Sequence, residues 1–312
     1  MIISIRQPQC FSEIGARTNQ EDFLWPSPKE VNTENRVFVM CDGMGGHDKG
    51  EVASRTVATA LGAYLSDHLA PGEALTKAAF EQALAHAYDA LDDMDDGAFK
   101  KMGTTMTCIV LHSGGVLAAH IGDSRIYHVR PSLADADGRS GIIYQSADHS
   151  LVNQLLRIGE ITEEEAADFP QKNVITRAMQ PHLERRHKAD IINIDDVQAG
   201  DYFFLCSDGV LEQLSNEKLG AILKTDQSDE AKIHTILKVC EGKTRDNHTC
   251  WLVPIDRVEA EEADLEVSIE NEDDAPATVL NCQPEEKPKE KPEKADKSGC
   301  LICSLVVKIF KK

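Results

Sequence analysis

The sequence lacks any apolar run that approaches the roughly 20 residues a transmembrane helix requires, so we predict no membrane-spanning helix. Residues 1–6 carry no apolar core or cleavage site of the kind that marks a secretion signal. Cysteine is not scarce, but its number is odd: there are nine, mostly in or beside apolar segments, where cysteine acts as a small hydrophobic side chain. These features together predict a protein of the reducing cytoplasm.

Basic residues are few relative to acidic ones. There are 33 Lys and Arg against 53 Asp and Glu, which gives a formal net charge of -20. A surface with this charge repels nucleic acids and anionic membranes, so we expect no nucleic-acid partner. The charge would suit a cationic peptide substrate, although it is equally typical of ordinary acidic cytosolic proteins.

The 312 residues suffice for one large domain followed by an extension. We place the folded domain at residues 1–256. Residues 257–297 are acidic and then rich in Glu, Lys and Pro, which predicts a disordered linker because such a segment buries too little apolar surface to fold. Residues 298–312 are apolar and tipped with lysine, and Cys300 and Cys303 could be a zinc half-site, a redox pair or lipidated thiols. We favour a short peripheral membrane anchor or a segment that docks on a partner protein.

Hydrophobic periodicity predicts strands with helices inserted between them. Apolar or β-branched runs predict strands at residues 36–41, 104–111, 116–121, 125–130, 188–194, 202–206 and 248–255. Helical spacing predicts helices at residues 48–69, 73–94, 216–223 and 229–240, with short helical pieces within residues 149–180. Long antiparallel strands combined with helix pairs favour two layers of sheet covered by helices.

Five short motifs place carboxylates at the ends of apolar stretches. They are Arg17–Asp22, Cys41–His47, Ile121–Arg125, Cys206–Gly209 and Arg245–Asn247. A single Asp-Gly pair is ordinary turn chemistry, but turns alone do not explain several such motifs in one chain. Carboxylate and carbonyl oxygens are the ligands that hard cations such as Mg²⁺ and Mn²⁺ prefer. The motifs therefore predict a two-metal site that hydrolyses phosphate esters.

These motifs resemble those of the metal-dependent Ser/Thr protein phosphatases (PPM family, type 2C) in their bacterial form. The resemblance covers residues 8–255 and includes Met102–Thr105, Asp148–Val152 and Gly159–Ala166. It implies an α+β fold, a four-layer αββα sandwich of two antiparallel sheets flanked by helix pairs, with the metals at one edge of the sheets. It also implies that a water activated by two Mn²⁺ or Mg²⁺ ions hydrolyses phosphoserine and phosphothreonine in proteins. A cognate Ser/Thr protein kinase and a monomeric state are further expectations from the family.

The resemblance assigns the metal ligands residue by residue. Asp42 should bridge the two ions and hold the attacking water. The backbone carbonyl of Gly43 should bind one ion, and a glycine at that position lets the backbone approach closely. Asp208 and Asp246 should ligate the other ion.

Other motif residues are expected to support these ligands or the substrate. Glu21 and Asp22 should hold metal-bound waters, with direct ligation by Asp22 left open. Arg17 should bind the substrate phosphate, because a guanidinium fork matches two phosphate oxygens. Asn247 should support Asp246.

Several positions leave alternatives open. Asp123 matches a ligand of a third metal in bacterial members, but Glu212 stands where the usual partner is Asp. Met44 stands where eukaryotic members carry a His that is proposed as the general acid. His47 could be an acid or a substrate contact, or a solvated turn residue, and His149 is more simply explained as structural.

A second hypothesis is a pseudophosphatase, a regulatory module that binds phosphoproteins without turnover. It would require damaged metal ligands, and all the principal carboxylates are present. A third keeps the enzyme but changes the target, for example to phosphotyrosine.

Overall fold

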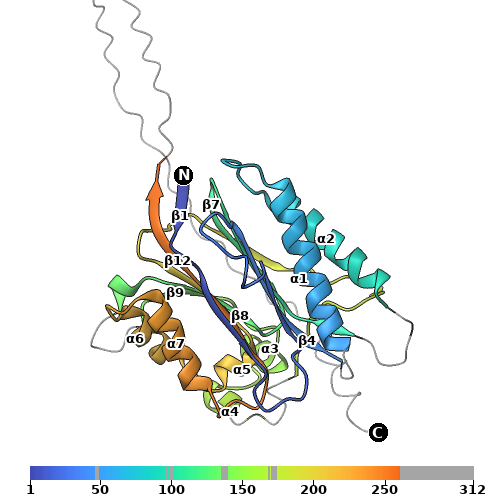
Figure 1. Ribbon diagram of the computed structural model, residues 1–312. Coiled ribbons are helices and arrows are strands. Elements are labelled where there is room, and N and C mark those ends of the chain that lie inside the picture. Colours follow the sequence, from blue (N-terminus) through green and yellow to red (C-terminus); the bar gives the residue numbers. More distant parts are fainter. Residues whose placement is uncertain are drawn as a thin grey trace, which may run out of the picture. The chain divides into compact units, whose positions relative to one another are not determined.

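The computed structural model describes residues 1–45, 49–95, 97, 102–134, 140–167, 169 and 174–260. Two antiparallel sheets of six strands each form the centre of the fold (Figure 1). One sheet has the order β1 (Ile2–Ile5), β12 (His248–Glu259), β11 (Tyr202–Cys206), β8 (Arg125–Val129) and β9 (Ile142–Gln145), with β2 (Gln9–Glu13) beside β12. The other has the order β10 (Asp190–Ile194), β7 (Gly115–Ile121), β6 (Met106–His112), β4 (Val37–Met44) and β3 (Asp22–Trp25), with β5 (Gly103–Thr104) beside β4.

The two sheets pack face to face over an apolar core. Phe38 of β4 and Trp251 of β12 are both fully buried, and their rings meet edge to face with centroids 5.5 Å apart. The indole Nε1–H of Trp251 donates to the backbone carbonyl of Val39 at 3.2 Å, which satisfies its one buried donor. The strands in this centre are buried on both faces, which explains why β6, β7 and β11 are mostly apolar along their whole length.

Helices cover the outer face of each sheet. The helices α1 (Lys49–His68) and α2 (Lys77–Asp93) pack on the sheet that contains β4, and α5 (Asp208–Leu211), α6 (Asn216–Lys224) and α7 (Asp229–Cys240) pack on the other (Figure 1). Short helices α3 (Leu151–Arg157) and α4 (Glu163–Ala167) and a 3-10 turn (Pro131–Leu133) occupy connections. The predicted four-layer αββα sandwich is therefore confirmed.

Some element boundaries differ from the predicted ones. The second helix begins at Lys77 rather than at residue 73, because the Thr76 side chain caps it by accepting from the Ala79 N–H. The strand β4 continues beyond Asp42 to Met44, since Gly43 and Met44 pair with β5. The strands β1, β2, β3 and β9 were not predicted.

The last strand, β12, runs four residues beyond its predicted end because Ile2–Ile5 pairs with it. Residues 261–297 of the predicted linker and the segment 298–312 lie outside the described residues. Among the helices that are described, none is both long and apolar enough to cross a membrane.

Candidate active site

The pairing of β3 with β4 brings two of the acidic motifs together. Asp22 and Asp42 are register partners on these antiparallel strands. The backbone N–H of Gly43 donates to the carbonyl of Glu21 at 3.0 Å, which extends the pairing by one step. Glu21, Asp22, Asp42 and Gly43 therefore occupy one end of the sheet, as the metal-binding hypothesis requires.

Two threonines fix the backbone at Asp42. The Asp42 N–H donates to Thr105 Oγ1 at 3.0 Å, and the Asp42 carbonyl accepts from Thr104 Oγ1 at 2.9 Å and from the Thr105 N–H at 2.8 Å. Thr105 Oγ1 also lies 2.9 Å from Ser124 Oγ, next to Asp123. Sequence alone suggested only that these threonines begin a strand, and the structure shows that they also position a candidate ligand.

The other sheet contributes Asp208 and Asp246 from its adjacent strands β11 and β12. Asp208 is the first residue of α5, two residues after β11 ends, and Asp246 lies two residues before β12 begins. Cys206 and Cys250 are register partners, so both carboxylates lie at the same end of this sheet. A Cβ on Gly209 would lie 2.0 Å from the carbonyl oxygen of Asn247, so this approach requires glycine.

Asn247 joins the two sheets. Its Nδ2 donates to the carbonyls of Ile14 and Asn19, each at 2.9 Å, and its Oδ1 accepts from the Glu21 N–H at 2.8 Å. Its own backbone N–H donates to Asp246 Oδ1 at 2.8 Å. The contact to Asp246 comes from the backbone N–H of Asn247, and its side chain holds the Glu21 segment; its expected role in supporting a metal ligand stays a prediction.

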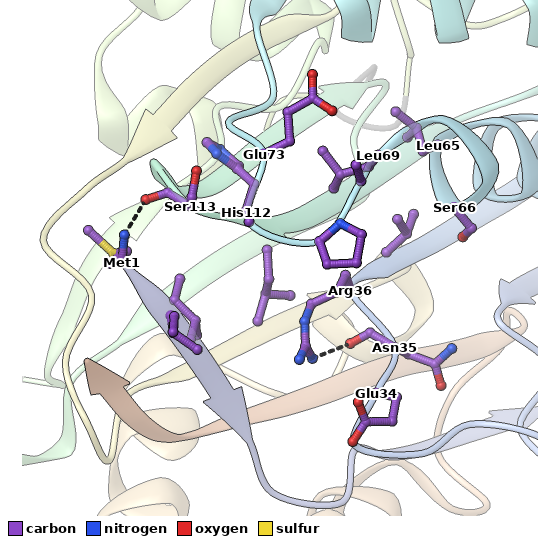
Figure 2. A pocket seen from close by; sticks show the side chains of 17 residues that line it. Met1, Glu34, Asn35, Arg36, Leu65, Ser66, Leu69, Glu73, His112 and Ser113 are labelled. Carbon is purple, nitrogen blue, oxygen red and sulfur yellow. Dashed lines mark hydrogen bonds between the residues drawn. The ribbon is translucent and has the colours of Figure 1, made fainter. Parts of the chain in front are cut away.

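Part of this set lines a pocket of about 350 Å³ at the edge of the sheets, whereas Asp22, Asp123 and Asn247 are not among its lining residues. Its lining consists of Arg17, Thr18, Asn19, Glu21, Asp42, Gly43, Met44, Gly45, Ile175, Asp208 and Asp246. A larger pocket, of about 630 Å³, lies at the opposite end of β4, where Met1, Arg36, Leu65 and His112 are among its lining residues (Figure 2). None of the motif carboxylates lines that larger pocket, so the chemistry points to the smaller one.

The carboxylates are crowded and partly buried, which makes their charged forms costly. Burial raises the pKa of Asp42 well above its ordinary value, and Asp22 and Asp208 raise it further. Burial likewise raises the pKa of Asp22 to about 7, although hydrogen bonds from Thr249 and Ser207 oppose the rise. It raises the pKa of Asp208 to about 6, with Asp246 as the next cause.

A group of buried carboxylate oxygens has no hydrogen-bond partner among the described residues. These atoms are Asp22 Oδ1, Asp123 Oδ1 and Asp208 Oδ1. Buried polar atoms are normally paired, so three unpaired oxygens among clustered negative charges indicate that positive charge belongs there. The donors are all oxygen, which fits Mg²⁺ or Mn²⁺ and does not fit a metal that prefers Cys and His.

Arg17 lies at the mouth of the pocket. Its side chain is 54% exposed, and its Nη2 donates to Asp246 Oδ2 at 2.5 Å. The guanidinium is therefore anchored beside a candidate metal ligand while part of it still faces solvent.

Comparison with known proteins agrees with this geometry. A family model described as protein phosphatase 2C matches residues 14–247, three quarters of the chain. The chain belongs to this family. It is 31% identical over 250 residues to protein phosphatase PhpP of Streptococcus pneumoniae, a match that covers 78% of this chain and 95% of that protein.

Solved structures of the family share the fold. The crystal structure of the Mycobacterium tuberculosis serine/threonine phosphatase PstP superposes with a TM-score of 0.66 at 30% identity, and covers 82% of this chain and 100% of that one. Another structure shows the catalytic domain of PstP in complex with two manganese ions; it superposes with a TM-score of 0.63 and covers 82% and 100% of the two chains, again at 30% identity.

Two of the positions that sequence left open are placed in this phosphatase 2C domain. Asp123 has a pKa raised to about 7 by burial, with the charge of Asp208 as the next cause. Glu212 Oε2 accepts from the Arg245 N–H at 3.0 Å, so the longer side chain is tied to the Asp246 loop. His47 lies outside the described residues, and its role stays a prediction.

Sequence reasoning missed the residues that support Asp22. Ser207 Oγ donates to Asp22 Oδ2 at 2.9 Å, and the Thr249 N–H donates to Ser207 Oγ at 3.0 Å. Ser207 was visible in the Cys206–Gly209 motif, but its partner lies 185 positions earlier in the chain. Only the packing of one sheet on the other reveals the contact.

A histidine cluster lies near the Asp123 turn. The ligand atoms of His120, His149 and Asp190 fall within 4.8 Å of one another, close enough for a metal site. However, His149 Nδ1 accepts from the Gly122 N–H at 3.1 Å, and Nε2 lies 3.1 Å from Asp190 Oδ2 and 3.2 Å from Arg177 Nη1. Arg177 also donates to Asp190 at 2.9 Å. These contacts account for His149 as a structural residue that braces the turn before Asp123.

Proposed function

We propose that this chain is a metal-dependent phosphatase that hydrolyses phosphoserine and phosphothreonine in proteins, using two Mn²⁺ or Mg²⁺ ions. The observation that carries the proposal is the convergence of carboxylates from both sheets on one pocket, with unpaired buried oxygens on Asp22 and Asp208. The names of its relatives, which are protein phosphatases, support the same reaction class.

Asp42, Asp208, Asp246 and the carbonyl of Gly43 would hold the two ions. When bound, such ions supply an activated water and stabilise the charge that develops on the phosphoryl group. Asp123 is the candidate for a third ion, and the nearby charge of Asp208 raises its pKa. The protein's own part is to fix these ligands through the threonine contacts to Asp42 and the Asn247 bridge.

Arg17 would bind the substrate phosphate. A guanidinium presents parallel donors that match two phosphate oxygens, and Asp246 already orients it from one side. Because the pocket opens at the edge of the sheets, it can accept a side chain that projects from a protein surface. Met44 at the pocket wall has no proton to give, so the leaving group's proton must come from another source.

The natural partners would be phosphoproteins and the Ser/Thr kinase that phosphorylates them. The phosphatase itself would be a monomer. The segment 298–312 would act as a membrane anchor or docking peptide. Deleting it should move the protein from a membrane or complex fraction into the soluble fraction, and unchanged fractionation would refute that role.

Replacing Asp42 tests the site. The Asp42→Asn variant keeps the shape of the side chain but loses the charge that would bridge two cations. We expect kcat/KM on a phosphothreonine peptide to fall by more than the roughly 100-fold that losing an outer-shell partner costs. Asp67→Asn, an exposed carboxylate on α1, is the matched control and should leave activity unchanged. Full activity of Asp42→Asn would refute the assignment.

A further inference from the structure

The turn between β7 and β8 links two of the candidate metal ligands. It carries Asp123, and its Ser124 hydroxyl lies 2.9 Å from Thr105 Oγ1, the atom that accepts from the Asp42 N–H at 3.0 Å. Gly122 of the same turn has a φ of +115°, and a Cβ at this position would lie 2.6 Å from Thr105 Cγ2. The turn therefore packs directly on the threonine that fixes Asp42, so a shift of the turn would disturb both carboxylates.

Two adjacent residues, Asp148 and His149, hold the ends of this turn. Arg125 Nε and Nη2 donate to Asp148 Oδ1 and Oδ2, both at 2.7 Å, which makes a bidentate ion pair. The His149 backbone N–H donates to the Gly122 carbonyl at 2.9 Å, and His149 Nδ1 accepts from the Gly122 N–H at 3.1 Å. These hydrogen bonds fix the turn at its first and its last residue.

The two side chains are shielded from water but do not reach the catalytic pocket. His149 is 2% exposed, and the side chains of Asp148 and Arg125 are 14% and 26% exposed. A partly buried bidentate pair is screened less than an exposed one and holds a more defined geometry. Within the described chain, neither Asp148 nor His149 is among the residues that line the catalytic pocket. Any effect on the reaction must therefore pass through the turn.

We propose that Asp148 and His149 are positioning residues for phosphate hydrolysis. They fix the turn that carries Asp123 and, through it, the backbone of Asp42, without touching substrate or cation. The inference rests on the proposed function, because Asp42 and Asp123 are candidate ligands assigned there. Replacing a residue that orients metal ligands in this way typically lowers metal affinity or activity by roughly 10–100-fold.

An equivalent ion pair elsewhere in the fold separates positioning from plain stability. Arg6 Nε and Nη2 donate to Asp229 Oδ2 and Oδ1 at 2.7 and 3.2 Å, again as a bidentate pair. The Arg6 and Asp229 side chains are 36% and 14% exposed, so their burial is close to that of the pair at the turn. Within the described residues, this pair forms no hydrogen bond to a candidate metal ligand. Losing it should therefore cost stability alone.

The first test compares Asp148→Asn with Asp229→Asn, each of which weakens one ion pair of this type. Both should lower the melting temperature of the metal-free protein. Only Asp148→Asn should lower kcat on a phosphothreonine peptide by roughly 10–100-fold with little change in KM, and weaken Mn²⁺ binding by a similar factor in isothermal titration calorimetry. Equal losses of kcat and Mn²⁺ affinity in the two variants, or wild-type values of both in Asp148→Asn, would overturn the proposal.

A second pair of variants tests His149 separately. His149→Asn keeps a hydrogen-bond acceptor on Cγ, where histidine carries Nδ1, and His149→Leu keeps a similar volume without an acceptor. Both lose the Nε2 contact to Asp190, so the comparison isolates the bond to the Gly122 N–H. We expect His149→Asn to retain most of the kcat and Mn²⁺ affinity that His149→Leu loses, with both proteins folded by circular dichroism. If the two variants behave alike, the side chain does not position the turn.

Failure of the proposed function is distinguishable from failure of this inference. In the first case the wild-type protein hydrolyses neither the phosphothreonine peptide nor p-nitrophenyl phosphate at any Mn²⁺ concentration. In the second case the wild type is active, and the Asp148 and His149 variants keep its kcat and its Mn²⁺ affinity.

Discussion

At the scale of single residues, the site depends on side chains that never touch the substrate. Ser207 donates to Asp22 across the interface between the sheets, and Thr249 fixes the hydroxyl. The five acidic motifs identified the candidate ligands from sequence because their residue types carry the chemistry. The supporting residues could not be found in this way. A serine or threonine has no distinctive sequence pattern, and its role appears only once the fold brings it to its partner.

Ser207→Ala should therefore lower both the stability of the protein and the affinity of the site for metal. The substitution removes one of the donors that stabilise the buried Asp22 carboxylate, so we expect a loss of about 1–3 kcal/mol in the free energy of unfolding. Mn²⁺ affinity should fall by roughly 10–100-fold, as for other outer-shell partners. Urea denaturation and Mn²⁺ titration measure the two effects.

Ser66→Ala is the matched control for this substitution. Among the described residues, the Ser66 hydroxyl bonds only to a carbonyl of its own helix, so its loss should change neither quantity appreciably. Equal behaviour of the two variants would show that Ser207 does not support the site.

At the scale of elements, the sequence predicted the strands that are buried on both faces and missed the short ones. The strands β6, β7 and β11 are buried at every position and mostly apolar because a sheet packs on one side and helices pack on the other. In contrast, β2 and β9 have only one or no fully buried residue, and their conformation depends on pairing with β12 and β8. Such pairing is a tertiary property that local pattern does not contain.

The junction between α5 and β12 offers a prediction at this scale. Gly209→Ala would place a Cβ 2.0 Å from the Asn247 carbonyl oxygen, which must push the Asp208 and Asp246 loops apart. We expect lower thermal stability and a large loss of phosphatase activity. Gly103→Ala is the milder comparison, because the nearest atoms to its Cβ are flexible side-chain atoms at 3.1 and 3.2 Å. If both variants have the same melting temperature and the same phosphatase activity, the close approach at Gly209 does not matter for the site.

At the scale of the whole molecule, the carboxylate cluster should link stability to pH and to metal. Asp22 has a pKa of about 7 in the folded protein against an ordinary value of 3.8. Between these values the folded state binds a proton that the unfolded state does not, so the metal-free protein should lose stability as pH rises from about 4 to about 7. Above this range the charge is fully present, and bound cations would offset it.

We therefore expect Mn²⁺ to raise the melting temperature more at pH 8 than at pH 5, because protons compete with the cation at the lower pH. Differential scanning fluorimetry at both values, with and without Mn²⁺, measures the difference. The Asp22→Asn variant lacks the titrating group and should show a weaker dependence of its metal-free melting temperature on pH. Equal Mn²⁺ shifts at both pH values would contradict the assignment of the cluster as a cation site.

The central claim is that divalent cations held by these carboxylates drive phosphate hydrolysis. The most direct measurement is the rate at which the purified full-length protein releases phosphate from a phosphothreonine peptide, first with EDTA and then with Mn²⁺ restored. We predict that EDTA abolishes turnover and that Mn²⁺ recovers it. Undiminished turnover in EDTA, or a folded protein that stays inactive at every Mn²⁺ and Mg²⁺ concentration, would contradict the claim.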